Sequence, residues 1–239
     1  MVLIASAMVA AAQEAKQPST VDPIDDLMDQ ASKLSGRGDS AGAVKLLEQA
    51  LAKAQKDPKL KGRDAQVMRG MGHVYATAKR YPDAVRVYKT LLEATKADCV
   101  AGNPLAEVCA DNYYDLGTAQ MYTEDWAGAA ASLRKGISIY EVVVRGATLP
   151  SYKMAKLKLE ANSQSMLAAA MFRAGDLPGA ISTWQKAIQQ YQTVVNNPDS
   201  GDGLRVLARQ SMMQEQQSLK LVKEEQQRRA AAQPTTPKK

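Results

Sequence analysis

The chain has 239 residues, of which 45% are hydrophobic, 23% are charged and only 5% are aromatic. This composition supports a buried core but disfavours an all-β sandwich or barrel, whose strands are rich in β-branched and aromatic side chains. The single histidine, His73, and the two cysteines, Cys99 and Cys109, exclude a multi-histidine metal site and a four-cysteine zinc site within one chain. We expect no metal and no cofactor.

The formal net charge is +6, and the basic excess is concentrated near the C-terminus. The segment from Asp202 onward holds eight Lys/Arg residues, four Asp/Glu residues and no aromatic residue. Proteins that bind nucleic acids usually carry Lys and Arg along a whole face, often together with stacking aromatic rings. The charge pattern therefore does not favour nucleic acid as a partner.

The first twelve residues, Met1 to Ala12, are uncharged and mostly apolar. The run is shorter than the roughly 20 residues that span a bilayer, and it ends in small residues, as the apolar part of a secretory signal peptide does. It predicts export, with cleavage near Ala12 and a periplasmic mature chain without a transmembrane span. No Lys or Arg precedes the run, so an apolar N-terminal helix is the alternative. Residues 13–22 are polar, contain Pro18 and are predicted to form a linker.

A short phrase recurs four times between residues 23 and 200. Each copy is a polar turn that leads into a helix start and ends in alanine. The copies are Gly38-Asp39-Ser40-Ala41-Gly42-Ala43, Lys79-Arg80-Tyr81-Pro82-Asp83-Ala84, Glu124-Asp125-Trp126-Ala127-Gly128-Ala129 and Gly175-Asp176-Leu177-Pro178-Gly179-Ala180.

Large and small side chains flank each phrase at helical spacing. Four residues after the phrase alanine comes a large residue, and small residues such as Gly72 and Gly117 stand on the segment before the phrase. The large residues are Leu47, Tyr88, Leu133 and Trp184. This pattern predicts two antiparallel helices per unit, in which small residues let the backbones approach and large residues fill the spaces between them. One such pair cannot bury its apolar face alone, so neighbouring units must stack.

The two cysteines flank the turn between the second and third units. Gly102 favours a turn, and Asn103-Pro104 predicts a helix start with asparagine as the N-cap and proline at the first helical position. Cys99 would then end one helix, and Cys109 would lie about a turn and a half into the next. We expect a disulfide that clips this corner, which indicates an oxidising compartment. Two buried free thiols are the alternative.

The repeat resembles the tetratricopeptide repeat, most closely in the second unit. That unit has Met71-Gly72, Tyr75, Ala84, Tyr88 and Leu91 at the spacing of the family. The early tryptophan of the family is absent, and the phrase alanines lie 41, 45 and 51 residues apart, further than the usual period of about 34. The resemblance implies an all-α, right-handed superhelical solenoid of four long-period helical hairpins over residues 23–200.

The segment 201–232 predicts a C-terminal capping helix. It contains no glycine or proline after Gly203 and has apolar residues such as Leu207 and Met212 in its first half. That half is expected to cover the last repeat, as the terminal unit of a solenoid must. Beyond Val222 the segment is polar and basic on all sides, and we expect it to project into solvent or to meet another chain. Residues 233–239, which include two prolines, are predicted to be a disordered tail.

No arrangement of side chains in the sequence points to catalysis. His73 has no evident serine or cysteine partner, so we interpret it as a hydrogen-bonding surface residue, with a general base as the alternative. Gly70 and Gly72 lack the third glycine and the preceding strand of a dinucleotide-binding site. We therefore expect no catalytic residue and no enzymatic activity.

The resemblance also implies a concave groove lined by the first helix of each unit. The offsets of the family's groove fall here on Arg69, His73, Thr77, Asp111, Tyr114, Thr118, Met121, Tyr122, Asn162, Ser165, Ala169, Phe172 and Arg173. Polar groups mixed with rigid rings suit a peptide or helix ligand, because rings bury area at a low cost in entropy. For Tyr122 and Phe172, packing against the next repeat is the alternative. Tyr81, at a turn, is expected to fill the local core.

Together these features predict a non-enzymatic interaction scaffold of the bacterial cell envelope. It would bind a partner peptide or helix through the concave groove, through the basic C-terminal helix, or through both. One alternative is an accessory or regulatory subunit of an envelope enzyme complex, with the chemistry in the partner. Another is a hydrolase of the envelope that uses His73.

Overall fold

The computed structural model describes residues 22–60, 62–100 and 103–232. The predicted signal segment 1–12, all but the last residue of the predicted linker and the predicted tail 233–239 lie outside the described residues.

Within these ranges the chain forms nine α-helices, two short 3₁₀ turns and no β-strand. The α-helices are α1 (Pro23–Gly36), α2 (Ser40–Lys56), α3 (Arg63–Thr77), α4 (Tyr81–Ala94), α5 (Ala106–Tyr122), α6 (Trp126–Gly146), α7 (Pro150–Arg173), α8 (Leu177–Asn196) and α9 (Asp202–Ala232). The 3₁₀ turns are η1 (Pro58–Leu60), after α2, and η2 (Lys96–Asp98), after α4. The predicted all-α class is confirmed.

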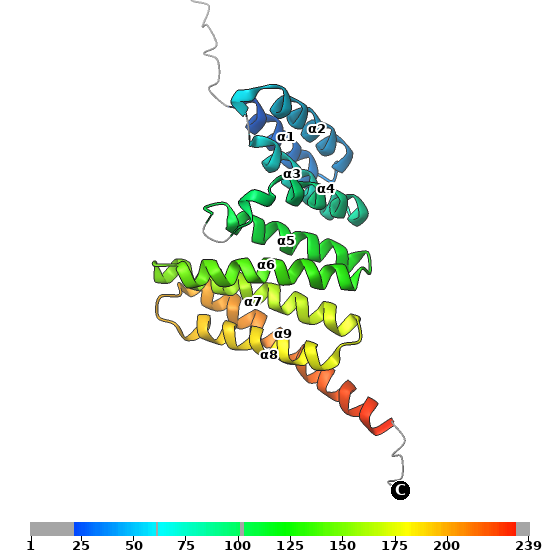
Figure 1. Cartoon of the computed structure of the whole chain (residues 1–239), viewed down its shortest axis with the longest axis vertical. Helices are drawn as coiled ribbons and strands as arrows, with labels where there is room; N and C mark the ends of the chain where they lie inside the picture. The colour runs from blue at the N-terminus through cyan, green and yellow to red at the C-terminus, as the bar shows by residue number, and fades with distance from the viewer. Residues whose placement is uncertain (1–21, 61, 101–102, 233–239) are drawn as a thin grey trace, which may run out of the picture.

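The helices stack in chain order into a solenoid (Figure 1). Each helix packs against the next, so that α1–α2, α3–α4, α5–α6 and α7–α8 form four hairpins. The helix α9 covers the last hairpin, where its Ala208 and Val222 are buried among side chains of α7 and α8. The end of α9 extends beyond α8. The predicted solenoid with a capping helix is confirmed.

The recurring phrase begins with a residue that ends the first helix of each hairpin. This residue adopts the left-handed backbone conformation in all four units, at Gly38 (φ 85°), Lys79 (φ 58°), Glu124 (φ 61°) and Gly175 (φ 90°). The backbone N–H of the following residue then donates to a carbonyl five residues back, as Asp39 does to Leu34 at 2.9 Å. This is the hydrogen bond of a Schellman-type helix end.

The aspartate of the phrase starts the second helix in three of the four units. The carboxylates of Asp39, Asp125 and Asp176 accept a hydrogen bond from the backbone N–H three residues later, at 2.8 to 2.9 Å. Each of them satisfies an N–H group that the helix itself leaves unpaired. In the second unit Arg80 stands at this position and makes no side-chain cap. The phrase therefore encodes the end of one helix and the start of the next.

Small residues bring the two helices of a hairpin together. Gly72 of α3 faces the ring of Tyr88 on α4, and a methyl group added at Gly72 would lie 2.6 Å from that ring. Gly117 of α5 faces Leu133 of α6 in the same way, at 2.6 Å. The four phrase alanines are all 0% exposed. The fit of large side chains against small ones sets the distance between paired helices.

Two glycines of α3 give a matched test of this packing. We expect Gly72→Ala to lower the free energy of unfolding by about 1–3 kcal/mol, because the ring of Tyr88 leaves no room for the methyl group. At Gly70 the nearest atom to an added methyl group lies 3.6 Å away, so Gly70→Ala should raise that free energy by up to about 1 kcal/mol. Urea unfolding followed by circular dichroism measures both, and the reverse order would contradict this account.

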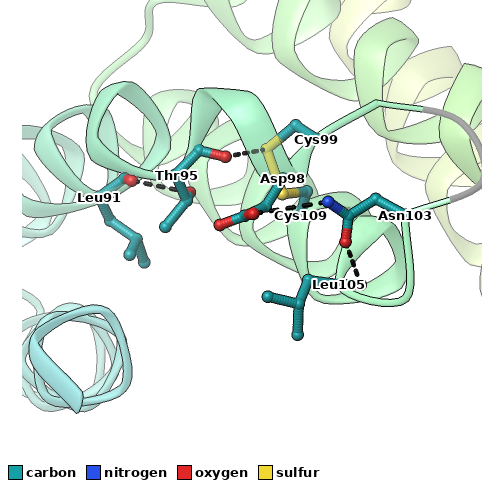
Figure 2. Close-up of a disulfide and its surroundings, with 7 residues drawn as sticks. All are labelled: Leu91, Thr95, Asp98, Cys99, Asn103, Leu105 and Cys109. Atoms are coloured by element: carbon teal, nitrogen blue, oxygen red, sulfur yellow. Dashed lines mark hydrogen bonds between the residues drawn. A yellow bond between two sulfur atoms is a disulfide. The ribbon is translucent and has the colours of Figure 1, made fainter. Parts of the chain in front are cut away.

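The connection between α4 and α5 carries a disulfide between Cys99 and Cys109 (Figure 2). The two Cα atoms are 5.3 Å apart, and Cys109 lies in the first turn of α5, where it is buried. Asn103 accepts a hydrogen bond from the N–H of Leu105 at 2.8 Å. It thus caps a turn ahead of α5, which begins at Ala106, two residues later than predicted. The predicted pairing of the cysteines is supported.

Removing the bridge should destabilise the protein. The cysteines are 10 residues apart in sequence, and closing so short a loop contributes about 3 kcal/mol through the unfolded chain. We expect the double variant Cys99→Ser, Cys109→Ser to lose about that much in urea unfolding, and reduced wild type to match it. Equal stability of the oxidised and reduced wild type would refute this expectation.

Candidate functional site

The predicted groove residues lie on α3, α5 and α7, the first helices of their hairpins. The structure joins those of α3 and α5 by two polar contacts. Nε2 of His73 lies 2.8 Å from Oδ2 of Asp115, and Nη2 of Arg69 lies 3.3 Å from Oδ2 of Asp111. Asp115, the partner of His73, was not among the residues predicted from the sequence. It stands one helical turn after the predicted Asp111, so the helical spacing of α5 is the signal that could have found it.

A hollow of about 450 Å³ opens between α3 and α5 beside the His73–Asp115 contact. It is lined by His73, Ala76, Thr77, Tyr81, Tyr88, Asp115, Thr118, Ala119 and Tyr122. The structure thus brings four of the predicted groove residues together at one place: His73, Thr77, Thr118 and Tyr122.

Two tyrosine rings form one side of the hollow. Tyr81 and Tyr122 stack with their ring centres 4.3 Å apart and their planes within 10° of each other. Tyr122 is 62% exposed, so a broad aromatic surface faces solvent. Tyr81 lies in this stack, whereas the sequence suggested a role in the local core. Tyr88 is buried below, and burial raises the pKa of its hydroxyl.

The other predicted residues of α5 are turned toward the interior. Asp111 accepts hydrogen bonds from Arg69 and from the hydroxyl of Tyr140 on α6. Tyr114 and Met121 are half-buried against the apolar cluster formed by α5, α6 and α7, and burial raises the pKa of the Tyr114 hydroxyl. These side chains therefore pack α5 against α6 and α7 and do not line the hollow.

The predicted residues of α7 do not reach the hollow. Asn162 accepts a hydrogen bond from the hydroxyl of Tyr191 at 2.8 Å, and Ser165 is buried. Phe172 tilts against Trp184 with the ring centres 6.2 Å apart, next to side chains of α9, and the half-buried Ala169 belongs to the same cluster. Arg173 is exposed.

A second and larger cavity lies at the other end of the α3–α5 pair. Its volume is about 900 Å³, and it is lined by residues at the ends of α2 and α4 and at the starts of α3 and α5, together with Asp98. Arg69 lies on its wall and is the one predicted groove residue that does so among those described. The sequence pattern gave no sign of this cavity, because it results from the path of the connection rather than from the repeat.

Over the described ranges, no three His, Cys, Asp or Glu side chains lie close enough together to hold a metal ion. In that part of the chain, no helix combines the length and the apolar character needed to cross a membrane.

Residues 28–98 match the family model described as the tetratricopeptide repeat. Among solved structures, the putative kinesin light chain nearly identical TPR-like repeats of Podosopora anserina align with a TM-score of 0.58 at 16% identity, over 87% of this chain and 99% of that one. BtubC (BKLC) of P. vanneervenii aligns with a TM-score of 0.58 at 15% identity, over 90% of this chain and 84% of that one. A search of curated proteins gives no match.

The chain has the fold of a tetratricopeptide-repeat solenoid. At these identities the structural likeness shows the fold alone. Proteins of this repeat family are in general scaffolds for protein–protein interaction.

The fourth unit of this solenoid contains a buried carboxyl group, Glu160, which is 3% exposed. The side-chain amide of Gln190 donates a hydrogen bond to it. Burial raises the pKa of Glu160 above its ordinary value of 4.5, because the charged form loses hydration, while the bond from Gln190 acts in the opposite direction. The carboxylate therefore destabilises the folded chain at neutral pH.

Replacing this carboxyl group should stabilise the protein in a pH-dependent way. Protonated Glu160 contributes stability that is fully present below pH 4.5 and is lost as the pH rises through its folded pKa. We expect Glu160→Gln to raise the melting temperature by a few degrees at pH 7, with the difference from wild type vanishing below pH 4.5. Calorimetry across this range measures it, and a difference that does not depend on pH would refute the assignment.

Proposed function

We propose that this solenoid is a non-enzymatic scaffold that binds a segment of a partner protein in the hollow between α3 and α5. The family supports protein binding in general, and the hollow supports this place on the molecule. The observation that carries the proposal is the exposed stack of Tyr81 and Tyr122 beside the polar pair of His73 and Asp115.

The chemistry of the hollow suits recognition of a peptide or helix. The stacked rings offer rigid apolar area, which a partner can cover at a low cost in entropy. The side chain of His73 is 51% exposed, so its ring can also meet a polar group of the partner. Thr118 of α5 also lines the hollow.

We also propose that the scaffold is exported and acts in the periplasm of a bacterial cell envelope. The disulfide between Cys99 and Cys109 supports this location, since such bonds persist in oxidising compartments. The partner can be a structural component or an enzyme that the scaffold assists.

Crosslinking in cells tests the place of binding. We expect a photo-crosslinking residue at position 122, in the hollow, to capture a specific partner that mass spectrometry identifies. The same residue in place of Lys89, which is exposed on α4, serves as the control and should not capture that partner. Capture from position 89 and not from position 122 would place the interaction elsewhere.

Affinity of the captured partner for purified variants tests the residues. Tyr122→Ala and His73→Ala should each weaken binding about tenfold, or about 1.4 kcal/mol, because each removes a contact surface of the hollow. Both side chains are more than half exposed, so the melting temperature should stay close to that of wild type. Leu149→Ala removes a side chain that is 67% exposed outside the hollow and should leave the affinity unchanged. Calorimetric titration measures all three, and unchanged affinity in both hollow variants would exclude this site.

A further inference from the structure

The capping helix α9 has one apolar face that the described chain does not cover. Ten large apolar side chains are exposed in the described residues, and four of them lie on this helix: Val206, Leu207, Met213 and Leu221. The opposite face of α9 carries the buried Ala208 and Val222, which pack against the last hairpin. The stack of hairpins ends at α9 (Figure 1), so no further hairpin of the described chain lies over its outer face.

The exposed side chains form one stripe along α9. With 3.6 residues per turn, Val206, Met213 and Leu221 lie within about 80° of one another around the helix axis. The polar residues of the stripe between Val206 and Leu221 are exposed glutamines: Gln210, Gln214 and Gln217. Apolar residues separated by seven and eight positions are typical of a helix that packs against another helix.

An antiparallel second copy of α9 matches this stripe. If the two-fold axis passes beside Met213, Val206 of one copy stands opposite Leu221 of the other. In the same register Gln210 stands opposite Gln217 of the other copy. Apolar side chains then meet apolar side chains, and the carboxamides can donate to and accept from each other. The stripe is therefore complementary to itself, as the interface of a two-fold dimer must be.

The charges at the two ends of α9 favour the antiparallel arrangement over a parallel one. Asp199 and Asp202 are exposed at its start, where Arg205 donates to backbone carbonyls of the preceding loop and lies 3.7 Å from Asp202. Residues 220–229, near its end, include four basic and two acidic residues. Antiparallel copies place Asp202 of one within one helical turn of Arg228 of the other. Parallel copies would bring like charges together, which opposes association.

We infer that α9 forms the interface of a homodimer in which two capping helices pack antiparallel along this stripe. The uncovered apolar side chains are then buried between the two copies, which accounts for their position on the outside of the cap. The inference goes beyond the proposed function and does not depend on it, because the hollow lies between α3 and α5, away from α9. A dimer carries two such hollows and can therefore hold two segments of a partner at once.

Sedimentation velocity of the full chain tests the inference. We expect a concentration-dependent equilibrium between monomer and dimer. Met213→Glu should weaken the dimer at least tenfold, because it places two carboxylates close to each other at the two-fold axis. Leu149→Glu makes the same change at an apolar side chain that is exposed outside α9, and this control should dimerise as wild type does. Unchanged circular dichroism of both variants shows that neither effect comes from unfolding.

Introduced cysteines test the orientation of the two copies. The described chain has no free cysteine, so an added thiol can be followed by itself. The double variant Val206→Cys, Leu221→Cys should form disulfide-linked dimers under mild oxidation, because the two positions face each other across the interface. Val206→Cys alone should not, since the two copies of this position lie about 22 Å apart along the axis. Efficient crosslinking of the single variant would show a parallel pair and would refute the inference.

The outcomes also separate this inference from the proposed function. A chain that stays monomeric up to about 200 µM, or a dimer that Met213→Glu does not weaken, contradicts the interface on α9. Tyr122→Ala should leave the dimer intact, and Met213→Glu should leave the affinity of one partner segment for the hollow unchanged. Failure of the dimer therefore leaves the hollow proposal standing, and loss of partner binding at the hollow leaves the dimer standing.

Discussion

The close approach of paired helices at single glycine and alanine positions is the constraint on which the structure depends. Gly72 admits the ring of Tyr88, and Gly117 admits Leu133, with no space for one further methyl group. Such fits hold each hairpin at one spacing and leave its outer faces to be covered by the next hairpin. The outer face of the last hairpin is covered by the capping helix α9, whose Val222 packs in the apolar cluster around Trp184. The surfaces that remain available for binding are those that the stacking of the hairpins leaves uncovered.

The first helices of the second and third hairpins, α3 and α5, meet through both polar and apolar side chains. His73 contacts Asp115 and Arg69 contacts Asp111, while Leu116 and Ala119 of α5 belong to the same apolar cluster as side chains of α1 to α4. The long connection after α4, which the disulfide fixes, separates the second and third hairpins at one end. Two cavities result, one on each side of these polar contacts. The extra residues in the repeat period therefore leave cavities in the stack.

Local chemistry made the fold predictable from the sequence, while the sites required the tertiary arrangement. The left-handed residue of each phrase and the capping aspartate of three of them act within a few residues, so four copies were enough to predict four hairpins and their stacking. Exposure was partly predictable too, since Thr77, Tyr122 and Arg173 stand two residues before the left-handed position in their units and are all exposed. What each side chain meets was not predictable, because Phe172 lies beside side chains of α9 whereas Tyr122 stacks on Tyr81. The larger cavity has no counterpart in the repeat and could not be derived from it.

Buried polar groups are fully paired in some parts of the interior and lack partners in others. Between α5 and α6, Gln120 accepts from Ser132 at 2.7 Å and donates to Asp125 at 3.0 Å, and that network is complete in itself. Along the α3–α5 seam the situation is reversed. Of the seven buried side-chain nitrogen and oxygen atoms that lack a partner in the described chain, three belong to residues that line the two cavities: Arg69, Asn112 and Thr118. The other four, on Arg63, Trp184, Gln190 and Ser200, lie elsewhere in the stack. Each such atom lowers the stability of the folded chain, because it has lost its hydrogen bonds to water without gaining one in the protein.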